Sequence, residues 1–121
     1  MKVCTWFFLS AVLLANLGGP AAADWLQFRG PAGLAISSDK GVPVTWSADS
    51  NIAWKTALPG PGASSPIIIG ERVFITCYSG YGISKDDPGE QKNLKRHLLC
   101  IERKSGKILW RNQSHYGEDD L

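Results

Sequence analysis

The fold is decided by residues 98–110, which read LLCIERKSGKILW. An apolar run is followed by charged residues and Ser105-Gly106, and a second apolar run then closes on Trp110. Apolar and β-branched residues on both sides of a short polar turn are typical of a β-hairpin. Glycine adopts a positive φ at no steric cost, so Gly106 is expected to hold the turn. The stretch therefore predicts two antiparallel strands joined by a tight turn.

Strand-like segments recur along the rest of the chain. We expect strands at residues 51–56, 66–69, 72–78, 97–102 and 107–112. No segment after residue 23 has the periodicity of a helix. Several of the expected strands are apolar at consecutive positions, which is typical of a sheet that is covered on both faces. These features predict an all-β protein.

An internal repeat supports this prediction. Ile52-Ala53-Trp54-Lys55 is similar in type and order to Ile108-Leu109-Trp110-Arg111, with the two tryptophans 56 residues apart. Blades of β-propellers repeat with a period of about 40–50 residues. An insert rich in Gly, Asp and Lys at residues 79–95 accounts for the excess. The pattern therefore favours a repeat architecture.

Residues 1–23 have the form of a secretory signal peptide. Lys2 supplies the positive charge, residues 5–17 are mostly apolar, and Ala21-Ala22-Ala23 provides small residues for cleavage before Asp24. The alternative is an uncleaved membrane anchor, but the apolar run is shorter than the roughly 20 residues that spanning requires. We expect cleavage, a periplasmic or secreted location and no stable membrane anchor.

Residues 24–50 are predicted to be an extended lead segment without regular structure, because Gly and Pro punctuate them repeatedly. Trp25, Phe28 and Trp46 are expected to attach this segment to the domain. The formal net charge of the whole chain is +2, without a basic patch. This balance argues against nucleic acid as a partner.

The hairpin also resembles the repeat of pyrroloquinoline quinone (PQQ)-type β-propellers, which runs Ala-x-Asp-x-x-Thr/Ser-Gly-Lys-x-x-Trp. Cys100 stands at the alanine position, Glu102 at the aspartate, Ser105-Gly106-Lys107 at the turn and Trp110 at the tryptophan. The resemblance continues at residues 24–31, which are similar to the start of mature exported bacterial PQQ-like propeller proteins. The chain is thereby identified as a member of the quinoprotein alcohol dehydrogenase-like superfamily.

The resemblance implies an antiparallel four-stranded propeller blade plus a closing strand. Residues 51–121 would form the closing strand and the first blade, and the remainder of a seven- or eight-bladed ring is missing, so we expect an N-terminal fragment. Glu102, Ser105, Gly106, Lys107 and Trp110 are then structural residues of the repeat, since a repeated position usually supports the fold.

Complete relatives of this kind act mostly as binding or scaffolding modules of the bacterial envelope, as outer-membrane assembly lipoproteins do. The resemblance thus implies protein partners or further blades, with no catalytic, cofactor or metal residue in this chain. The alternative is the N-terminal piece of a PQQ-dependent dehydrogenase, which would use PQQ and calcium. Such enzymes carry an adjacent Cys-Cys pair, which this sequence lacks.

Two cysteines remain after cleavage, Cys77 and Cys100, on consecutive expected strands. Export to an oxidising compartment permits a disulfide between them. Such a bridge would stabilise the fold by about 3 kcal/mol. The alternative is a pair of buried free thiols.

Overall fold

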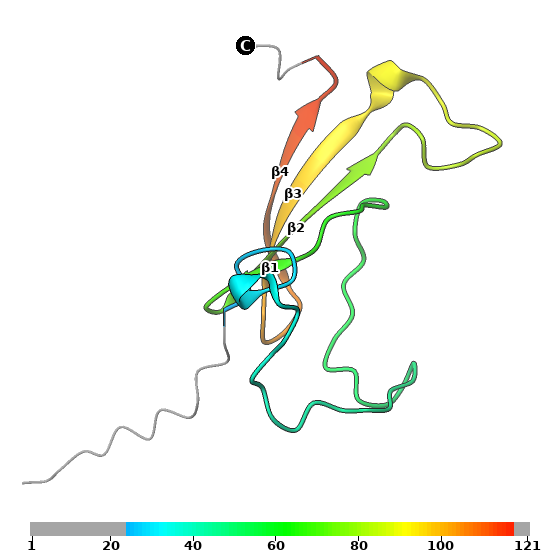
Figure 1. The fold of residues 1–121 in the computed structure, drawn as a ribbon. Coiled ribbons are helices and arrows are strands. Elements are labelled where there is room, and N and C mark those ends of the chain that lie inside the picture. The colour runs from blue at the N-terminus through cyan, green and yellow to red at the C-terminus, as the bar shows by residue number, and fades with distance from the viewer. Residues whose placement is uncertain (1–23, 118–121) are drawn as a thin grey trace, which may run out of the picture.

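The computed structural model describes residues 24–117, so the predicted signal peptide lies outside the described residues. Its strands are β1 (Ile67–Ile69), β2 (Arg72–Ser79), β3 (Lys95–Glu102) and β4 (Ile108–His115). They form one antiparallel sheet in the order β1-β2-β3-β4 (Figure 1). Two short 3₁₀ turns, η1 (Pro31–Gly33) and η2 (Gln91–Asn93), are the only helical elements among the described residues. The predictions of an all-β chain and of a strand at each of these four places are confirmed.

The two long central strands determine which side chains share a face. β2 pairs with β3 over its whole length, from Arg72 opposite Glu102 to Ser79 opposite Lys95. β4 continues the sheet, and a bulge near Cys100 leaves Leu109 without a partner position. Because alternate residues of a strand point to opposite sides, this register sorts the side chains into two faces.

One face carries the core and is called the covered face. Its side chains come from the buried positions of the two central strands and from residues packed against them: Val73, Cys77, Leu99 and Ile101, with Trp54, Leu58, Ile68 and Ile75. The opposite side, called the open face, carries Phe74, Leu98, Cys100 and Trp110. Leu98 and Trp110 there are 38% and 42% exposed. Residues 24–117 therefore cover the sheet on one side only.

Residues 51–56 form no strand, which corrects the prediction of a strand at this place. They run extended beside the sheet, and their contacts to the turn after β3 are made by the side chains of Trp54 and Thr56. A strand needs a neighbouring backbone to complete its ladder of hydrogen bonds. Residues 51–56 share no ladder of backbone hydrogen bonds with any strand of the described chain.

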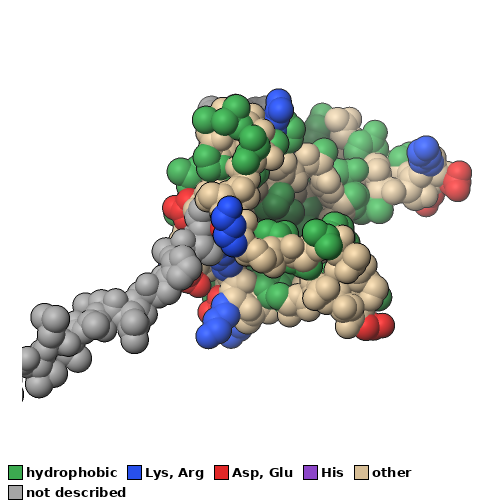
Figure 2. All heavy atoms as spheres, turned by 60° about the horizontal axis from the view of Figure 1, so that its bottom comes forward, with side chains coloured by type: hydrophobic (Ala, Val, Ile, Leu, Met, Phe, Trp, Pro, Cys, Tyr) green, Lys and Arg blue, Asp and Glu red, His purple; other side chains and the backbone are tan. Residues whose placement is uncertain are grey.

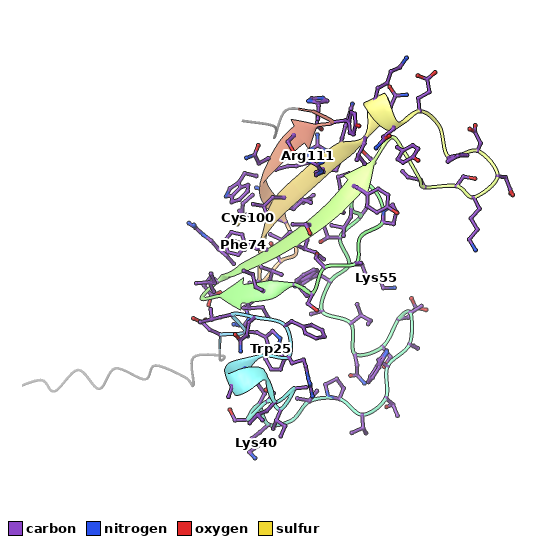
Figure 3. All side chains as sticks on the ribbon, turned by 45° about the horizontal axis from the view of Figure 1, so that its top comes forward. Trp25, Lys40, Lys55, Phe74, Cys100 and Arg111 are labelled. Atoms are coloured by element: carbon purple, nitrogen blue, oxygen red, sulfur yellow. The ribbon has the colours of Figure 1, made fainter. Side chains whose placement is uncertain are left out.

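The lead segment is attached to the sheet at its beginning. The backbone of Trp25 exchanges two hydrogen bonds with Ile68 of β1, at 2.9 and 2.8 Å. The Asp24 carboxylate accepts a third bond from the Gly70 amide at 2.7 Å. Figure 3 shows Trp25 close to β1, at the edge of the sheet.

The other two predicted anchors of the lead segment are wrong. Phe28 is 73% exposed and Trp46 is 68% exposed. The lead beyond η1, which contains Trp46, swings away from the sheet (Figure 1). Figure 2 shows hydrophobic side chains scattered over the surface on this side of the molecule, around a hollow.

The insert between β2 and β3 is shorter than predicted, because the strands reach Ser79 and Lys95. Its residues, 80–94, project from one end of the sheet (Figure 1). Within residues 24–117, no helix has the length and apolar character needed to cross a membrane.

Candidate functional site

The turn between β3 and β4 has the conformation predicted for it. Gly106 has a φ of 73°, and its amide donates a hydrogen bond to the Glu102 carbonyl at 2.8 Å. The Glu102 amide in turn donates to the carbonyl of Lys107 at 2.8 Å. The Ser105 hydroxyl donates to the Glu102 carboxylate and accepts from the Lys107 amide. Four of the five repeat residues therefore build one compact turn.

Trp54 is docked on this turn. A Cβ placed on Gly106 would lie 2.5 Å from carbon atoms of the Trp54 ring, so only glycine allows the ring to approach this closely. The Trp54 indole Nε1–H donates to the Arg103 carbonyl at 2.8 Å. Two residues later, the Thr56 hydroxyl donates to the Gly106 carbonyl at 2.5 Å. The turn is thus a socket for a tryptophan that comes from about 50 residues earlier in the chain.

Trp110, the fifth repeat residue, has no such socket among the described residues. It lies on the open face beside Phe74, with ring centroids 6.0 Å apart and an angle of 54° between the planes. Cys100 pairs with both residues across the sheet and is fully buried between them. Figure 3 shows Phe74 and Cys100 next to each other on β2 and β3. Trp110 covers the sheet below it but leaves its own outer surface exposed.

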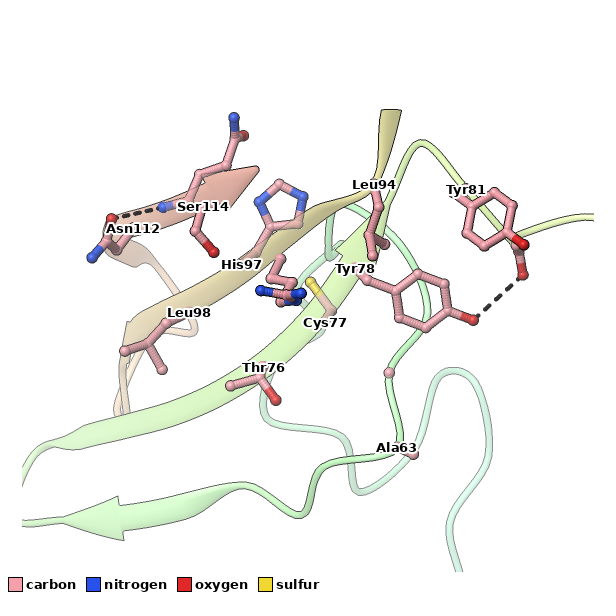
Figure 4. A pocket seen from close by; sticks show the side chains of 14 residues that line it. Ala63, Thr76, Cys77, Tyr78, Tyr81, Leu94, His97, Leu98, Asn112 and Ser114 are labelled. Carbon is pink, nitrogen blue, oxygen red and sulfur yellow. Dashed lines mark hydrogen bonds between the residues drawn. The ribbon is translucent and has the colours of Figure 1, made fainter. Parts of the chain in front are cut away.

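A groove of about 850 Å³ follows the open face away from Trp110. Its lining includes two cross-strand rows of open-face residues, Thr76, Leu98 and Asn112 followed by Tyr78, Arg96 and Ser114. Cys77 and His97 also contribute to this lining. Tyr81 and Leu94 lie at one end, and Ala63 lies at the side (Figure 4). Arg96 is the one charged residue of this lining. The open face is therefore apolar near Trp110 and polar toward the insert.

The structure also brings together a pair that the sequence did not indicate. On the covered face, the Nε2 atom of His97 lies 2.8 Å from the Ser79 hydroxyl oxygen. The ring is only 3% exposed, and its Nδ1 atom has no hydrogen-bond partner. Burial, followed by the nearby cations Arg111 and Lys95, holds the pKa of His97 below its usual value. This histidine is therefore neutral at neutral pH.

The two cysteines do not come together. Both are buried free thiols. Cys77 pairs with His97 on the covered face, whereas Cys100 pairs with Phe74 on the open face. Because the sheet separates them, the disulfide considered from the sequence does not form in this structure, and the alternative of two buried thiols describes it.

Residues 24–117 hold no cluster of three or more His, Cys, Asp or Glu side chains placed to bind a metal ion. No protein-family model, curated protein or solved structure matches the chain. The observations thus define an all-β chain with one four-stranded antiparallel sheet, a filled tryptophan socket and an open apolar face.

Proposed function

We propose that this chain is an exported binding or scaffolding module of the bacterial cell envelope, without a catalytic site of its own. Its sheet would be one blade of a PQQ-like β-propeller, and its partner would be a further blade of the same repeat. The resemblance at residues 98–110 and 24–31 supports the class of protein. The observation that carries the proposal is the docking of Trp54 on Gly106.

Trp54 and Trp110 stand in equivalent stretches of the internal repeat, yet within residues 24–117 only Trp54 of this pair has a socket. The contacts of Trp54 are the model for those proposed for Trp110. It lies against a glycine in a Ser-Gly-Lys turn and donates its N–H to a backbone carbonyl there. Trp110, 42% exposed, would meet the same kind of turn in the next blade. We therefore expect the contact between Trp110 and the next blade to resemble the contact that Trp54 makes with the Gly106 turn.

The surroundings of Trp110 agree with a protein partner. Phe74 lies beside it, and Ile69 and Leu98 on the same side of the sheet are 48% and 38% exposed. Contiguous apolar surface of this kind drives association once it exceeds a few hundred Å². A blade of a propeller gains its stability by stacking on neighbours, since one repeat cannot bury its own faces.

Size-exclusion chromatography with light scattering tests the proposal. A second copy is the available cover for the open face when no further blade is present, so the chain should self-associate. Trp110→Ala should weaken self-association at least tenfold. Trp46→Ala is the matched control, because Trp46 is also an exposed tryptophan but lies in the lead segment, and it should leave association unchanged. A cooperatively melting monomer would contradict the proposal.

A titration with PQQ and calcium separates this function from the dehydrogenase alternative. The scaffolding module should show no saturable binding of PQQ. Saturable, calcium-dependent binding would instead favour the enzyme.

A further inference from the structure

Two buried donor groups face the same side of the sheet across β2 and β3. Cys77 pairs directly with His97, and both belong to the covered face. The thiol residue is 5% exposed and the histidine 3% exposed. Directly opposed residues of an antiparallel pair have Cβ atoms about 4.5–5.5 Å apart. One small ion can bridge side chains at that separation.

His97 is satisfied at only one of its two ring nitrogens. Nε2 lies 2.8 Å from the Ser79 hydroxyl, and the buried Nδ1 has no partner. A buried polar atom without a partner costs free energy, so such an atom calls for an explanation. When Nε2–H donates to Ser79, Nδ1 carries the lone pair. Metal-binding histidines are commonly held by such a hydrogen bond on the other ring nitrogen.

The chemistry of the two groups selects the ion. A thiolate is a soft ligand, and imidazole also suits copper. Structural zinc needs about four protein ligands, which the described residues do not gather here. We propose that Cys77 and His97 form a two-donor site for a soft monovalent ion, Cu(I) or Ag(I). Binding forms a sulfur–metal bond and releases the thiol proton to solvent, and the metal does not change its oxidation state.

The chain segment that runs beside β2 packs closely on the backbone at Cys77. An added Cβ on Gly62 would lie 2.6 Å from the Thr76 carbonyl oxygen and 3.3 Å from the Cys77 Cβ. The lowered pKa of His97 is consistent with the site, since an uncharged imidazole is the form that binds metal.

Cys100 is a natural control for this proposal. It is as deeply buried as Cys77, but its cross-strand neighbours are Phe74 and Trp110, which offer no nitrogen or sulfur ligand. If the site depends on the Cys77–His97 pair, substitution of Cys77 should abolish binding, whereas substitution of Cys100 should leave it intact.

The experiment is an anaerobic titration of the reduced full chain with Cu(I), in competition with the chelator bicinchoninate. All samples carry Cys4→Ser, so that only the two described thiols are present. We expect one ion and one released proton per chain, with a near-ultraviolet thiolate–copper band. Cys77→Ala should lower affinity at least 100-fold and His97→Gln at least tenfold, whereas Cys100→Ala should retain it within twofold.

Circular dichroism checks that each variant folds. If Cys77→Ala does not fold, Ser79→Ala decides, because it keeps both ligands but removes the partner of Nε2. It should weaken Cu(I) binding about tenfold. Unchanged affinity in Cys77→Ala or, in its place, in Ser79→Ala would overturn the proposal, as would an equal loss in Cys100→Ala or the absence of saturable binding by the parent chain.

Discussion

The ring of Trp54 lies against the α-carbon of Gly106, and its Nε1–H reaches the Arg103 carbonyl at 2.8 Å. This contact joins residues that are about 50 positions apart, and Trp54 also packs against the core. A flexible loop of this length is costly to order, so the contact must compensate the lost chain entropy.

Gly106→Ala tests the close approach. The new Cβ would meet the Trp54 ring at 2.5 Å and would also hold alanine at a φ of 73°. We expect the free energy of unfolding to fall by at least about 2 kcal/mol, measured by urea denaturation. Gly41→Ala is the control, since Gly41 has a φ of 72° but nothing within 4 Å, and it should lose only about 1 kcal/mol. Equal losses would show that the Trp54 contact contributes nothing.

Trp54→Phe isolates the indole hydrogen bond. Phenylalanine keeps an aromatic ring but leaves the part-buried Arg103 carbonyl without its donor. The expected loss of stability is about 1 kcal/mol. Trp54→Ala, which also removes the ring, should cost about 3 kcal/mol. A smaller loss for alanine than for phenylalanine is incompatible with the docked ring.

Trp110→Ala should respond to the presence of a neighbouring blade. In this chain alone the side chain is 42% exposed, so the substitution should destabilise less than Trp54→Ala. In a complete propeller that contains the segment, the buried ring should be worth about 3–5 kcal/mol. Thermal melts of both proteins provide the comparison. No change in the complete propeller would mean that Trp110 faces solvent and that the assigned blade register is wrong.

Acidification should destabilise the fold through His97. Its pKa is lowered in the folded state by burial and by Arg111 and Lys95, so the unfolded chain binds more protons. The free energy of unfolding should therefore fall as the pH drops below the ordinary value of 6.5. His97→Gln should flatten this dependence in urea melts between about pH 5 and 7.

Export should remove residues 1–23. The apolar run and the small residues before Asp24 motivate this expectation. Asp24 and Trp25 then begin the mature chain and are the residues that bind Gly70 and Ile68. Mass spectrometry of the exported product should give a mass that starts at Asp24. An exported chain that still carries Met1 contradicts the signal assignment.

The sequence predicted the strands and the turn because these depend on neighbouring residues. Consecutive apolar residues identified β1 to β3, and Ser105-Gly106 located the hairpin turn with its positive φ. The all-β class followed from the absence of helical periodicity. Local backbone preference and local pattern were sufficient for these features.

The partners of individual side chains depended on register and docking, which no local pattern specifies. The sequence placed Phe28 and Trp46 on the domain, but both are exposed, because a tryptophan or phenylalanine in a Gly- and Pro-rich segment carries no information about which surface it meets. It also predicted a strand at 51–56, where the structure has an extended segment joined to the hairpin through Trp54 and Thr56.

The chemistry of the covered face was likewise a matter of tertiary structure. In the sequence, the insert separates Cys77 and Ser79 from His97. A shift of one residue in strand pairing would place His97 on the other face of the sheet. The sequence alone determined which segments form strands. Only the packed sheet decided that Cys77 faces His97 rather than Cys100, because side-chain direction alternates along a strand and the register selects the face.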